Sequence, residues 1–433
     1  METPNSKRQK HNKGQDMISN LPDFIIGHIL SFLPTKDAVR TSVLSKSWTY
    51  RWTFITDLHF EDTGRYSNRI VRRNLFLSFV YRVLLYLNSS SIQSFSLTIS
   101  EKYEPCHLDQ WISVVVSRGV KKLCVNSENK LTLSSHSIMK YKSLEQLVLC
   151  VVGCEIKVPT TACLSSLTVL NLSGIEFFGG TSNNSGKLHL DFPVLRTYKT
   201  TDCTWSPRIK CVTLKAPLLE VVSIKDVRHR LPPSNESHTA MNFCASSLTK
   251  FTYKGCLSPD TIVFDLSAAH IASAYIDIEH YIYAVENLQE MNALCSKLLK
   301  QFQNAKCLKF QRSYHGKELV LPLAKDLLAD LPTFEMLSHM ELGKITGENL
   351  LALLLKTPYL KTLVIPFGSL EGYENQHQLG FAKFVMENAV ALKRMSFIAD
   401  PKLSETSLEE VKEKLYTFKK CCSCMILEFL NSS

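Results

Sequence analysis

Large apolar residues are concentrated at Leu21 to Trp52, where the spacing predicts three short helices. The first helix is expected over Pro22 to Leu33, because proline is tolerated in a first turn and Pro34 ends the run. Thr35 is expected to cap the second helix, and Ser45 to begin the third. So many apolar side chains exceed what three short helices bury among themselves, so another surface is expected to cover them.

The apolar positions of the first helix are wider than one core-facing stripe. The spacing i, i+4, i+7 and i+8 predicts the stripe Ile25, Ile29, Phe32 and Leu33. Three further apolar residues broaden it, namely Phe24, Ile26 and Leu30. In the third helix, Trp48 and Trp52 are four residues apart and are expected to share one side.

A second pattern recurs from Ile92 onward: apolar, two others, apolar, one other, apolar. The clearer copies begin at Leu144, Leu167, Leu195, Leu219, Leu248, Leu337 and Leu360, and the weaker ones at Ile92, Val120, Ile271, Ala305 and Leu392. Most intervals fall within the roughly 20 to 29 residues of leucine-rich repeats. One such strand cannot bury its leucines alone, so the copies are expected to stack into a solenoid with a parallel sheet on its inner face.

Strand side chains alternate, so the residues between the template positions are expected to project from the inner face of that sheet. They form the expected binding surface for a protein substrate, whose identity the pattern does not give. The polar candidates for substrate contacts are Gln146, Asn171, Lys199, Lys250, His339 and Glu341.

The segment LPDFIIGHILSFLPTKDAVRTSVLSKSWTYRW resembles an F-box, the module that binds the Skp adaptor of cullin-based ubiquitin ligases. The resemblance rests on Leu21-Pro22, Ile25, Ile29-Leu30, Phe32-Leu33-Pro34, Val39, Val43 to Lys46 and the two tryptophans. The departures from the family pattern are Phe24, Ser47, Thr49 and Arg51. As adaptor contacts the resemblance implies Leu21, Pro22, Ile25, Ile29, Leu33, Pro34, Val43, Leu44 and Trp48.

The rest of the chain is similar to plant F-box proteins with leucine-rich repeats. After a basic connector, a helix is expected over Asn74 to Leu87, as in those proteins, and the end of the chain resembles their FBD module. The fold expected is α/β: a helical F-box, a leucine-rich-repeat solenoid and a mixed α/β cap. The expected division is 1–16 basic tail, 17–60 F-box, 61–90 connector and capping helix, 91–368 repeats and 369–433 FBD-like module.

Composition and charge limit the partners and compartments that can be expected. The net charge is +10, but basic and acidic residues are interspersed along the chain. This pattern does not favour nucleic acid as a partner. The basic cluster at residues 7–13 fits a nuclear signal and a solvated tail equally. The 14 cysteines are too sparse for a secreted disulfide scaffold, and the apolar runs are too short for a membrane span, so nucleus or cytoplasm is expected.

No motif for catalysis, a cofactor or a metal is found: GxxxxGK[ST], GxGxxG, GxSxG and HExxH are all missing from the sequence. Cys421, Cys422 and Cys424 lack the second ligand pair of a zinc site. The leading hypothesis is a non-catalytic substrate-recognition subunit of a Skp, cullin and F-box ubiquitin ligase. The alternative is a repeat scaffold or ligand-binding protein whose F-box does not recruit the cullin.

Overall fold

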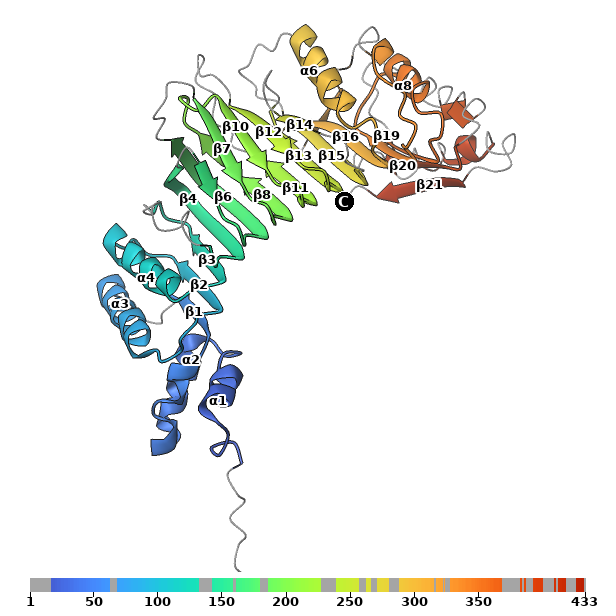
Figure 1. The fold of residues 1–433 in the computed structure, drawn as a ribbon. Coiled ribbons are helices and arrows are strands. Elements are labelled where there is room, and N and C mark those ends of the chain that lie inside the picture. The colour runs from blue at the N-terminus through green and yellow to red at the C-terminus, as the bar shows by residue number, and fades with distance from the viewer. Residues whose placement is uncertain are drawn as a thin grey trace, which may run out of the picture. The chain divides into compact units, whose positions relative to one another are not determined.

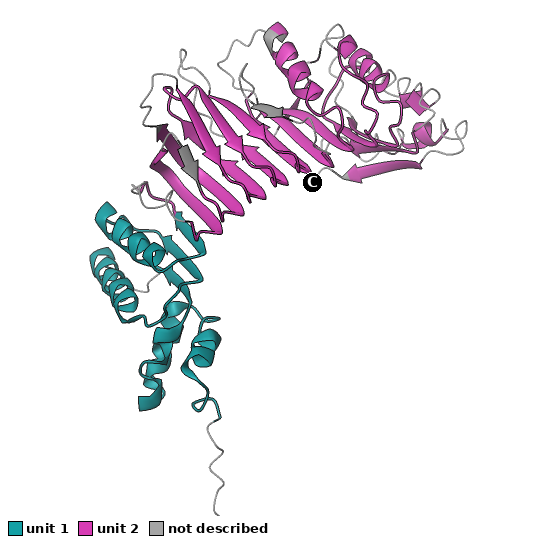
Figure 2. Ribbon diagram, viewed as in Figure 1, with its two compact units in different colours: residues 1–126 teal, residues 127–433 magenta. Residues whose placement is uncertain are grey.

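Two compact units make up the chain, Met1–Asn126 and Ser127–Ser433 (Figure 2). The computed structural model describes residues 17–62, 68–131, 142–158, 161–179, 186–226, 239–256, 262–265, 271–279, 288–314, 317–321, 323, 328–367, 382–383, 385–386, 392–399, 409, 412–417 and 426–431. The basic tail at 1–16 and the cysteines at 421, 422 and 424 lie outside these residues.

The first unit begins with short helices and continues as alternating strands and helices. Its helical part comprises α1 (Asp23–Leu30), α2 (Thr35–Arg40) and the 3-10 helices η1 (Thr41–Val43), η2 (Lys46–Trp48) and η3 (Arg51–Phe54). Then follow β1 (Asp57–Glu61), α3 (Arg69–Tyr86), β2 (Ser94–Ile99), α4 (Pro105–Ser117) and β3 (Lys122–Ser127). The strands form a sheet in the order β1-β2-β3, with α3 and α4 side by side along it (Figure 1).

The buried side of α1 is not the predicted stripe. Ile26 and Leu30 are buried, whereas Ile29, Phe32 and Leu33 are exposed. Between the two buried residues, a Cβ at Gly27 would lie 2.5 Å from the carbonyl oxygen of Phe54, so α1 packs closely on η3 through its backbone. The prediction was wrong because spacing alone cannot say which of two apolar sides faces the core.

Two further predictions for the helical part are corrected. Thr35 does not cap α2: it is the first helical residue, and its buried hydroxyl accepts a hydrogen bond from the backbone N–H of His59 at 2.7 Å. The third helix is two separate 3-10 turns rather than one helix from Ser45. Trp52 is buried, while half-buried Trp48 donates its indole N–H to the Ser19 hydroxyl at 2.7 Å.

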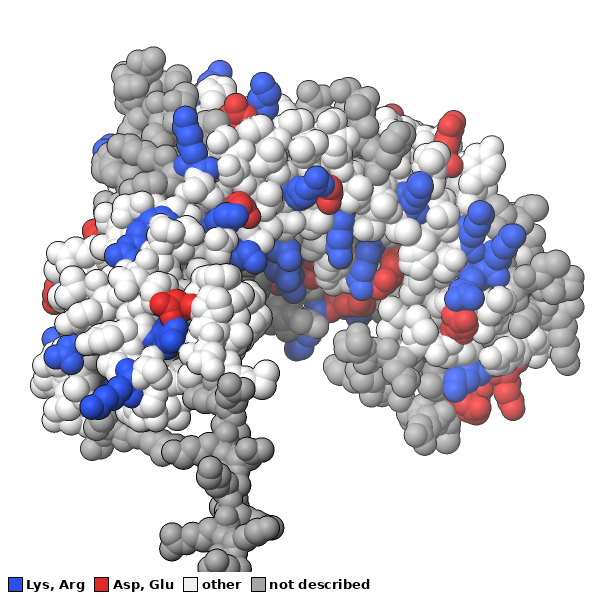
Figure 3. Space-filling model, turned by 60° about the horizontal axis from the view of Figure 1, so that its bottom comes forward, with Lys and Arg blue, Asp and Glu red and all other residues white. Residues whose placement is uncertain are grey.

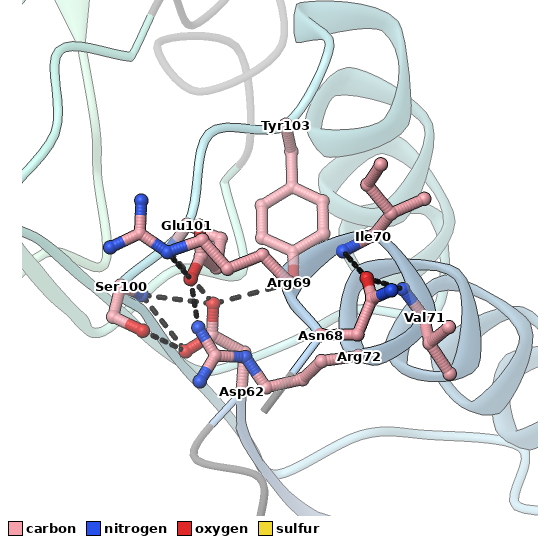
Figure 4. A network of polar contacts seen from close by, with 9 residues as sticks. All are labelled: Asp62, Asn68, Arg69, Ile70, Val71, Arg72, Ser100, Glu101 and Tyr103. Carbon is pink, nitrogen blue, oxygen red and sulfur yellow. Dashed lines mark hydrogen bonds and ion pairs between the residues drawn. The ribbon is translucent and has the colours of Figure 1, made fainter. Parts of the chain in front are cut away.

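Helix α3 starts at Arg69, earlier than the predicted Asn74, because the side chain of Asn68 accepts hydrogen bonds from the first-turn N–H groups of Ile70 and Val71. Figure 4 shows the polar contacts around this end of the helix. Buried Asp62, just after β1, accepts hydrogen bonds from the backbone N–H groups of residues 100 and 101, while Arg72 pairs with Glu101. These contacts join β1, α3 and the end of β2.

The second unit is built on one long sheet whose neighbouring strands run parallel (Figure 1). In spatial order its strands are β4 (Gln146–Val158), β6 (Val169–Gly179), β8 (Thr197–Thr201), β11 (Val221–Lys225), β13 (Lys250–Gly255), β15 (Ser273–Glu279), β16 (Cys307–Tyr314), β18 (His339–Leu342), β19 (Thr362–Phe367), β20 (Arg394–Ala399) and β21 (Ile426–Asn431). The short strand β9 (Thr204–Trp205) pairs parallel with β6, and β17 (Lys317–Leu319) pairs antiparallel with β16. Helices α6 (Leu288–Lys300) and α8 (Gly347–Leu354) belong to the later repeats.

The repeat pattern predicted these strands well. Each template start from Ile92 to Leu392 is buried, and each is followed two residues later by the first residue of a strand. The predicted α/β fold, a helical segment followed by parallel strands of leucine-rich-repeat type, is therefore confirmed. One earlier copy escaped notice, since Ile55, Leu58 and Phe60 carry the same spacing into β1 and are buried.

A second sheet was not predicted. It has the order β14-β12-β10-β7-β5, from β5 (Thr161–Cys163), β7 (Lys187–Asp191), β10 (Cys211–Lys215), β12 (Ala240–Cys244) and β14 (Ile262–Asp265). Buried Tyr198 of β8 and Phe243 of β12 meet edge to face with ring centroids 5.5 Å apart. The core of these repeats therefore lies between the two sheets.

Of the predicted FBD-like module at 369–433, the structure describes β20, β21 and short helical pieces at 382–383, 385–386, 409 and 412–417. The predicted final strand is confirmed as β21, which pairs parallel with β20. Phe397 and Phe429 stack between these two strands with ring centroids 5.7 Å apart. The other parts of the predicted module lie outside the described residues.

Candidate functional site

The helical end of the first unit exposes a dense set of apolar side chains, which we call the docking surface. Among the predicted adaptor contacts, Pro22, Ile29, Leu33, Pro34, Val43 and Leu44 are exposed, and Leu21, Ile25 and Trp48 are half-buried. Val43 has 85% of its surface exposed. A folded protein rarely leaves so many large apolar groups in water unless another surface covers them.

The docking surface includes residues that the resemblance did not assign. Met17, Ile18, Phe24, Phe32 and Tyr50 are also exposed, Phe32 to 78%. Phe24 and Phe32 had a signal in the sequence, because both belong to the apolar excess of the first helix. Phe24, a departure from the family pattern, therefore adds apolar area to the surface.

Hydrogen bonds and one ion pair hold the docking surface on its own unit. The Ser31 hydroxyl accepts the backbone N–H of Thr56 at 3.0 Å and donates to the carbonyl of Gly27 at 2.9 Å. Arg51, another departure from the family pattern, pairs with Asp23 of α1 and donates to the backbone carbonyl of residue 19. These contacts fix the position of the helical segment that carries the exposed residues.

A shallow pocket of about 530 Å³ adjoins the docking surface. Its lining combines apolar residues, such as Phe32, Leu33 and Pro34, with polar Asp57 and His59 of β1. Its position extends the docking surface toward the first strand of the sheet.

A second exposed region is one face of the sheet in the second unit, which we call the recognition face. The parallel register aligns its outward side chains in rows that cross the strands. The first row contains Gln146, Lys250 and His339, and the next contains Asn171, Lys199 and Glu341. All six predicted substrate contacts are therefore on one face, in two neighbouring rows.

Strands β15 to β18 place a group of carboxylates on this face. Asp277 is 1% exposed and accepts a hydrogen bond from the Ser313 hydroxyl at 2.7 Å. Lys254 of β13 contacts both Asp277 and Glu279, with nitrogen to oxygen distances of 3.3 Å. Burial lowers the pKa of Lys254, but the two carboxylates outweigh it and raise the pKa overall.

Neighbouring side chains complete this group. The hydroxyl of Tyr275 lies 3.5 Å from a carboxylate oxygen of Asp277, and burial together with that charge raises the pKa of Tyr275 to about 12. Lys309 pairs with Glu341 and lies 5.3 Å above the Tyr275 ring. Burial, with the nearby charges of Asp277 and Glu341, raises the pKa of the Glu318 carboxyl against the attraction of two lysines. This part of the face is polar and internally paired, and its side chains are buried or half-buried.

Two further findings concern metal binding and membrane insertion. Among the described residues, no group of three or more His, Cys, Asp or Glu is arranged to hold a metal ion. Within the same residues, no helix is both long enough and apolar enough to span a membrane.

Comparison with known proteins agrees with these two regions. The F-box domain family matches residues 18–53. An F-box/FBD/LRR-repeat protein of Arabidopsis thaliana is 28% identical over 434 residues, which cover 96% of this chain and 95% of that protein. A putative F-box/FBD/LRR-repeat protein of that plant is 28% identical, with coverage of 81% and 68%, and an F-box/LRR-repeat protein is 42% identical over 28% and 33%. The chain carries an F-box domain and is homologous over most of its length to F-box/FBD/LRR-repeat proteins of Arabidopsis thaliana.

Proposed function

We propose that this protein is the substrate-recognition subunit of a ubiquitin ligase of the Skp, cullin and F-box type. The observation that carries the proposal is the apolar docking surface, which coincides with the F-box match at residues 18–53. A Skp-type adaptor covers these side chains and links the chain to a cullin. The repeat units then hold a target protein on the same assembly.

The chain's contribution to the reaction is proximity rather than catalysis. Holding a target lysine near a ubiquitin-charged enzyme converts a bimolecular encounter into one within a single complex, which raises the effective concentration. No catalytic group, cofactor or metal is required of this chain. The nucleus and cytoplasm are the compartments that this role and the basic cluster at residues 7–13 favour.

A pull-down with a purified Skp-type adaptor tests the proposal. Val43 and Leu44 are 85% and 65% exposed, so the pair Val43→Asp and Leu44→Asp is expected to abolish adaptor capture while the fold persists. A charge placed at a buried apolar interface is strongly unfavourable unless it is paired. The matched control is Leu85→Asp on α3, where the side chain is 76% exposed and outside the docking surface.

The expected result is capture by the wild type and by Leu85→Asp, and loss with the double variant. Failure of the wild-type chain to bind the adaptor would contradict the proposal. In a second pull-down with both adaptor and cullin present, capture of the adaptor without the cullin would instead favour a repeat scaffold whose F-box does not recruit the ligase. The pair Leu21→Ala and Pro22→Ala provides a second test that adds no charge.

A further inference from the structure

The recognition face changes its charge along the sheet. On β6, β8, β11 and β13 its outward positions carry lysines, hydroxyl groups, one amide and two valines, with no carboxylate in the three aligned rows. The lysines are Lys199, Lys225, Lys250 and Lys254. On β15, β16 and β18 the rows carry Asp277 and Glu341. Figure 3 shows blue and red side chains gathered next to one another on one side of the molecule.

Three of these lysines, Lys199, Lys225 and Lys250, form what we call the lysine patch. Each is exposed, and the described structure shows none of them in an ion pair. Lys225 of β11 is the register partner of Lys254, so two like charges are neighbours across the strands. Lys254 is already paired with Asp277 and Glu279, whereas the three lysines of the patch are exposed and can pair with an anion from outside the chain.

The spacing of the lysine patch suits an extended peptide. Neighbouring strands are about 4.8 Å apart, and alternate residues along a strand are about 7 Å apart. Lys199 and Lys225 differ by one strand and one row. Lys250, Lys199 and Lys225 lie in three successive rows along the strand direction. Alternate side chains of an extended segment laid along the strands also repeat at about 7 Å, so its successive carboxylates reach one lysine in each row. The hydroxyl groups of Thr201, Ser223 and Thr252 lie between the lysines and can donate hydrogen bonds to the same carboxylates.

We propose that the lysine patch binds a short acidic segment of the target protein, with aspartate or glutamate at alternating positions in an extended conformation. This inference rests on the proposed function, because it names the class of target segment that the recognition face takes. The carboxylates on β15 to β18 limit the acidic part to the patch. The adjoining part of the segment is neutral or basic, since Asp277, Glu279 and Glu341 outnumber the two lysines, Lys254 and Lys309, that pair with them.

Two other anions fit the patch less well. Arginine matches phosphate through a two-pronged hydrogen bond, and the outward positions of β6 to β13 contain no arginine. Single-stranded nucleic acid is bound by a basic groove with aromatic side chains for base stacking, and these positions contain no aromatic residue. A long phosphate chain would also run onto the carboxylates of β15.

Fluorescence anisotropy with the purified full chain tests this inference. The probe is a fluorescein-labelled extended peptide with aspartate at alternating positions, and its matched control has asparagine at those positions. The variant Lys199→Gln, Lys225→Gln and Lys250→Gln removes the patch. Its control, Lys187→Gln, Lys210→Gln and Lys215→Gln, removes the same charge from exposed lysines on or beside the second sheet.

The expected result is that only the aspartate peptide binds the wild type, that the patch variant weakens binding at least tenfold, and that the control variant changes it less than twofold. Equal losses in both variants would overturn the inference, because they would indicate net charge rather than a site. Equal binding of the asparagine peptide, tighter binding of a phosphoserine peptide or of a single-stranded oligonucleotide, or no binding at all would overturn it too. Adaptor capture is measured separately, so either claim can fail alone.

Discussion

The docking surface and the recognition face expose opposite kinds of side chain. The docking surface is a cluster of exposed apolar residues on short helices, whereas the recognition face is a regular array of polar and charged residues on parallel strands. Burial of apolar area is strong and non-directional, while paired charges give specificity and depend on salt. The difference teaches that the two surfaces suit different kinds of partner, as the proposed role requires: an apolar adaptor surface for one and a charged target segment for the other.

Gly27→Leu is expected to have the largest effect of the changes considered. It should disrupt the docking surface and leave the recognition face intact. A Cβ at this position already meets the backbone of Phe54 at 2.5 Å, so a larger side chain forces α1 away from η3. Overpacking of this kind costs about 1–3 kcal/mol or more. Calorimetry should show a destabilised first unit, and the pull-down should show loss of adaptor capture.

Binding of the aspartate peptide should survive Gly27→Leu, because that residue belongs to the first unit and the lysine patch to the second. Loss of both activities would indicate that the two units fold together rather than separately.

Salt concentration is expected to have the next largest effect, and to affect binding at the two surfaces differently. Raising the sodium chloride concentration from 50 to 500 mM shortens the screening length from roughly 14 Å to roughly 4 Å. Peptide binding is expected to weaken about tenfold, and adaptor binding about twofold or less. Isothermal titration calorimetry at both concentrations measures each affinity. Equal salt dependence at the two surfaces would contradict the contrast between them.

Asp277→Asn is expected to have an intermediate effect on stability. The substitution removes the charge that faces Lys254 and weakens the acceptor for the Ser313 hydroxyl. Loss of a buried, charge-assisted interaction costs about 1–3 kcal/mol. The same substitution makes the recognition face more positive, so the aspartate peptide should bind more tightly. Denaturant unfolding and anisotropy measure these two changes, and weaker peptide binding in a folded variant would argue against the charge arrangement.

Glu318→Gln should have the smallest effect, and a pH series reveals its sign. Burial raises the pKa of this carboxyl, so the folded state disfavours its charged form. In the wild type that cost is fully present above the raised pKa and vanishes below the ordinary carboxyl pKa of about 4.3. The variant should therefore melt slightly above the wild type at pH 7 and equally at pH 3.5. A stabilisation that grows toward acid pH would contradict this assignment.

The repeated strands of the long sheet could be predicted from the sequence, because each repeat buries apolar residues at the same positions of a short local pattern. That is why starts such as Leu167 and Leu337 were followed by strands where the pattern placed them. The second sheet had a weaker signal, as in Leu188, Leu190 and Phe192, because alternation over so few residues also fits a loop. Its strands depend on a partner sheet that no single segment specifies.

The residues of the candidate site could also be predicted only in part. Resemblance gave residues such as Val43 and Leu44, and their exposure agrees with an interface. The orientation of α1 could not be predicted, because the side that carries buried Ile26 rather than half-buried Ile25 depends on the tertiary contact between α1 and η3 at Gly27. The lysine patch was only partly predicted. Lys199 and Lys250 were candidates, but the place of Lys225 beside them depends on the register between strands.

The most direct test of the central claim is whether one chain binds the ligase and the acidic segment simultaneously. Purified chain, Skp-type adaptor, cullin and the labelled aspartate peptide are mixed and separated by size-exclusion chromatography with fluorescence detection. The account predicts one peak that contains all four components. Displacement of the peptide by the adaptor, or a chain and adaptor complex that excludes the cullin, would contradict it.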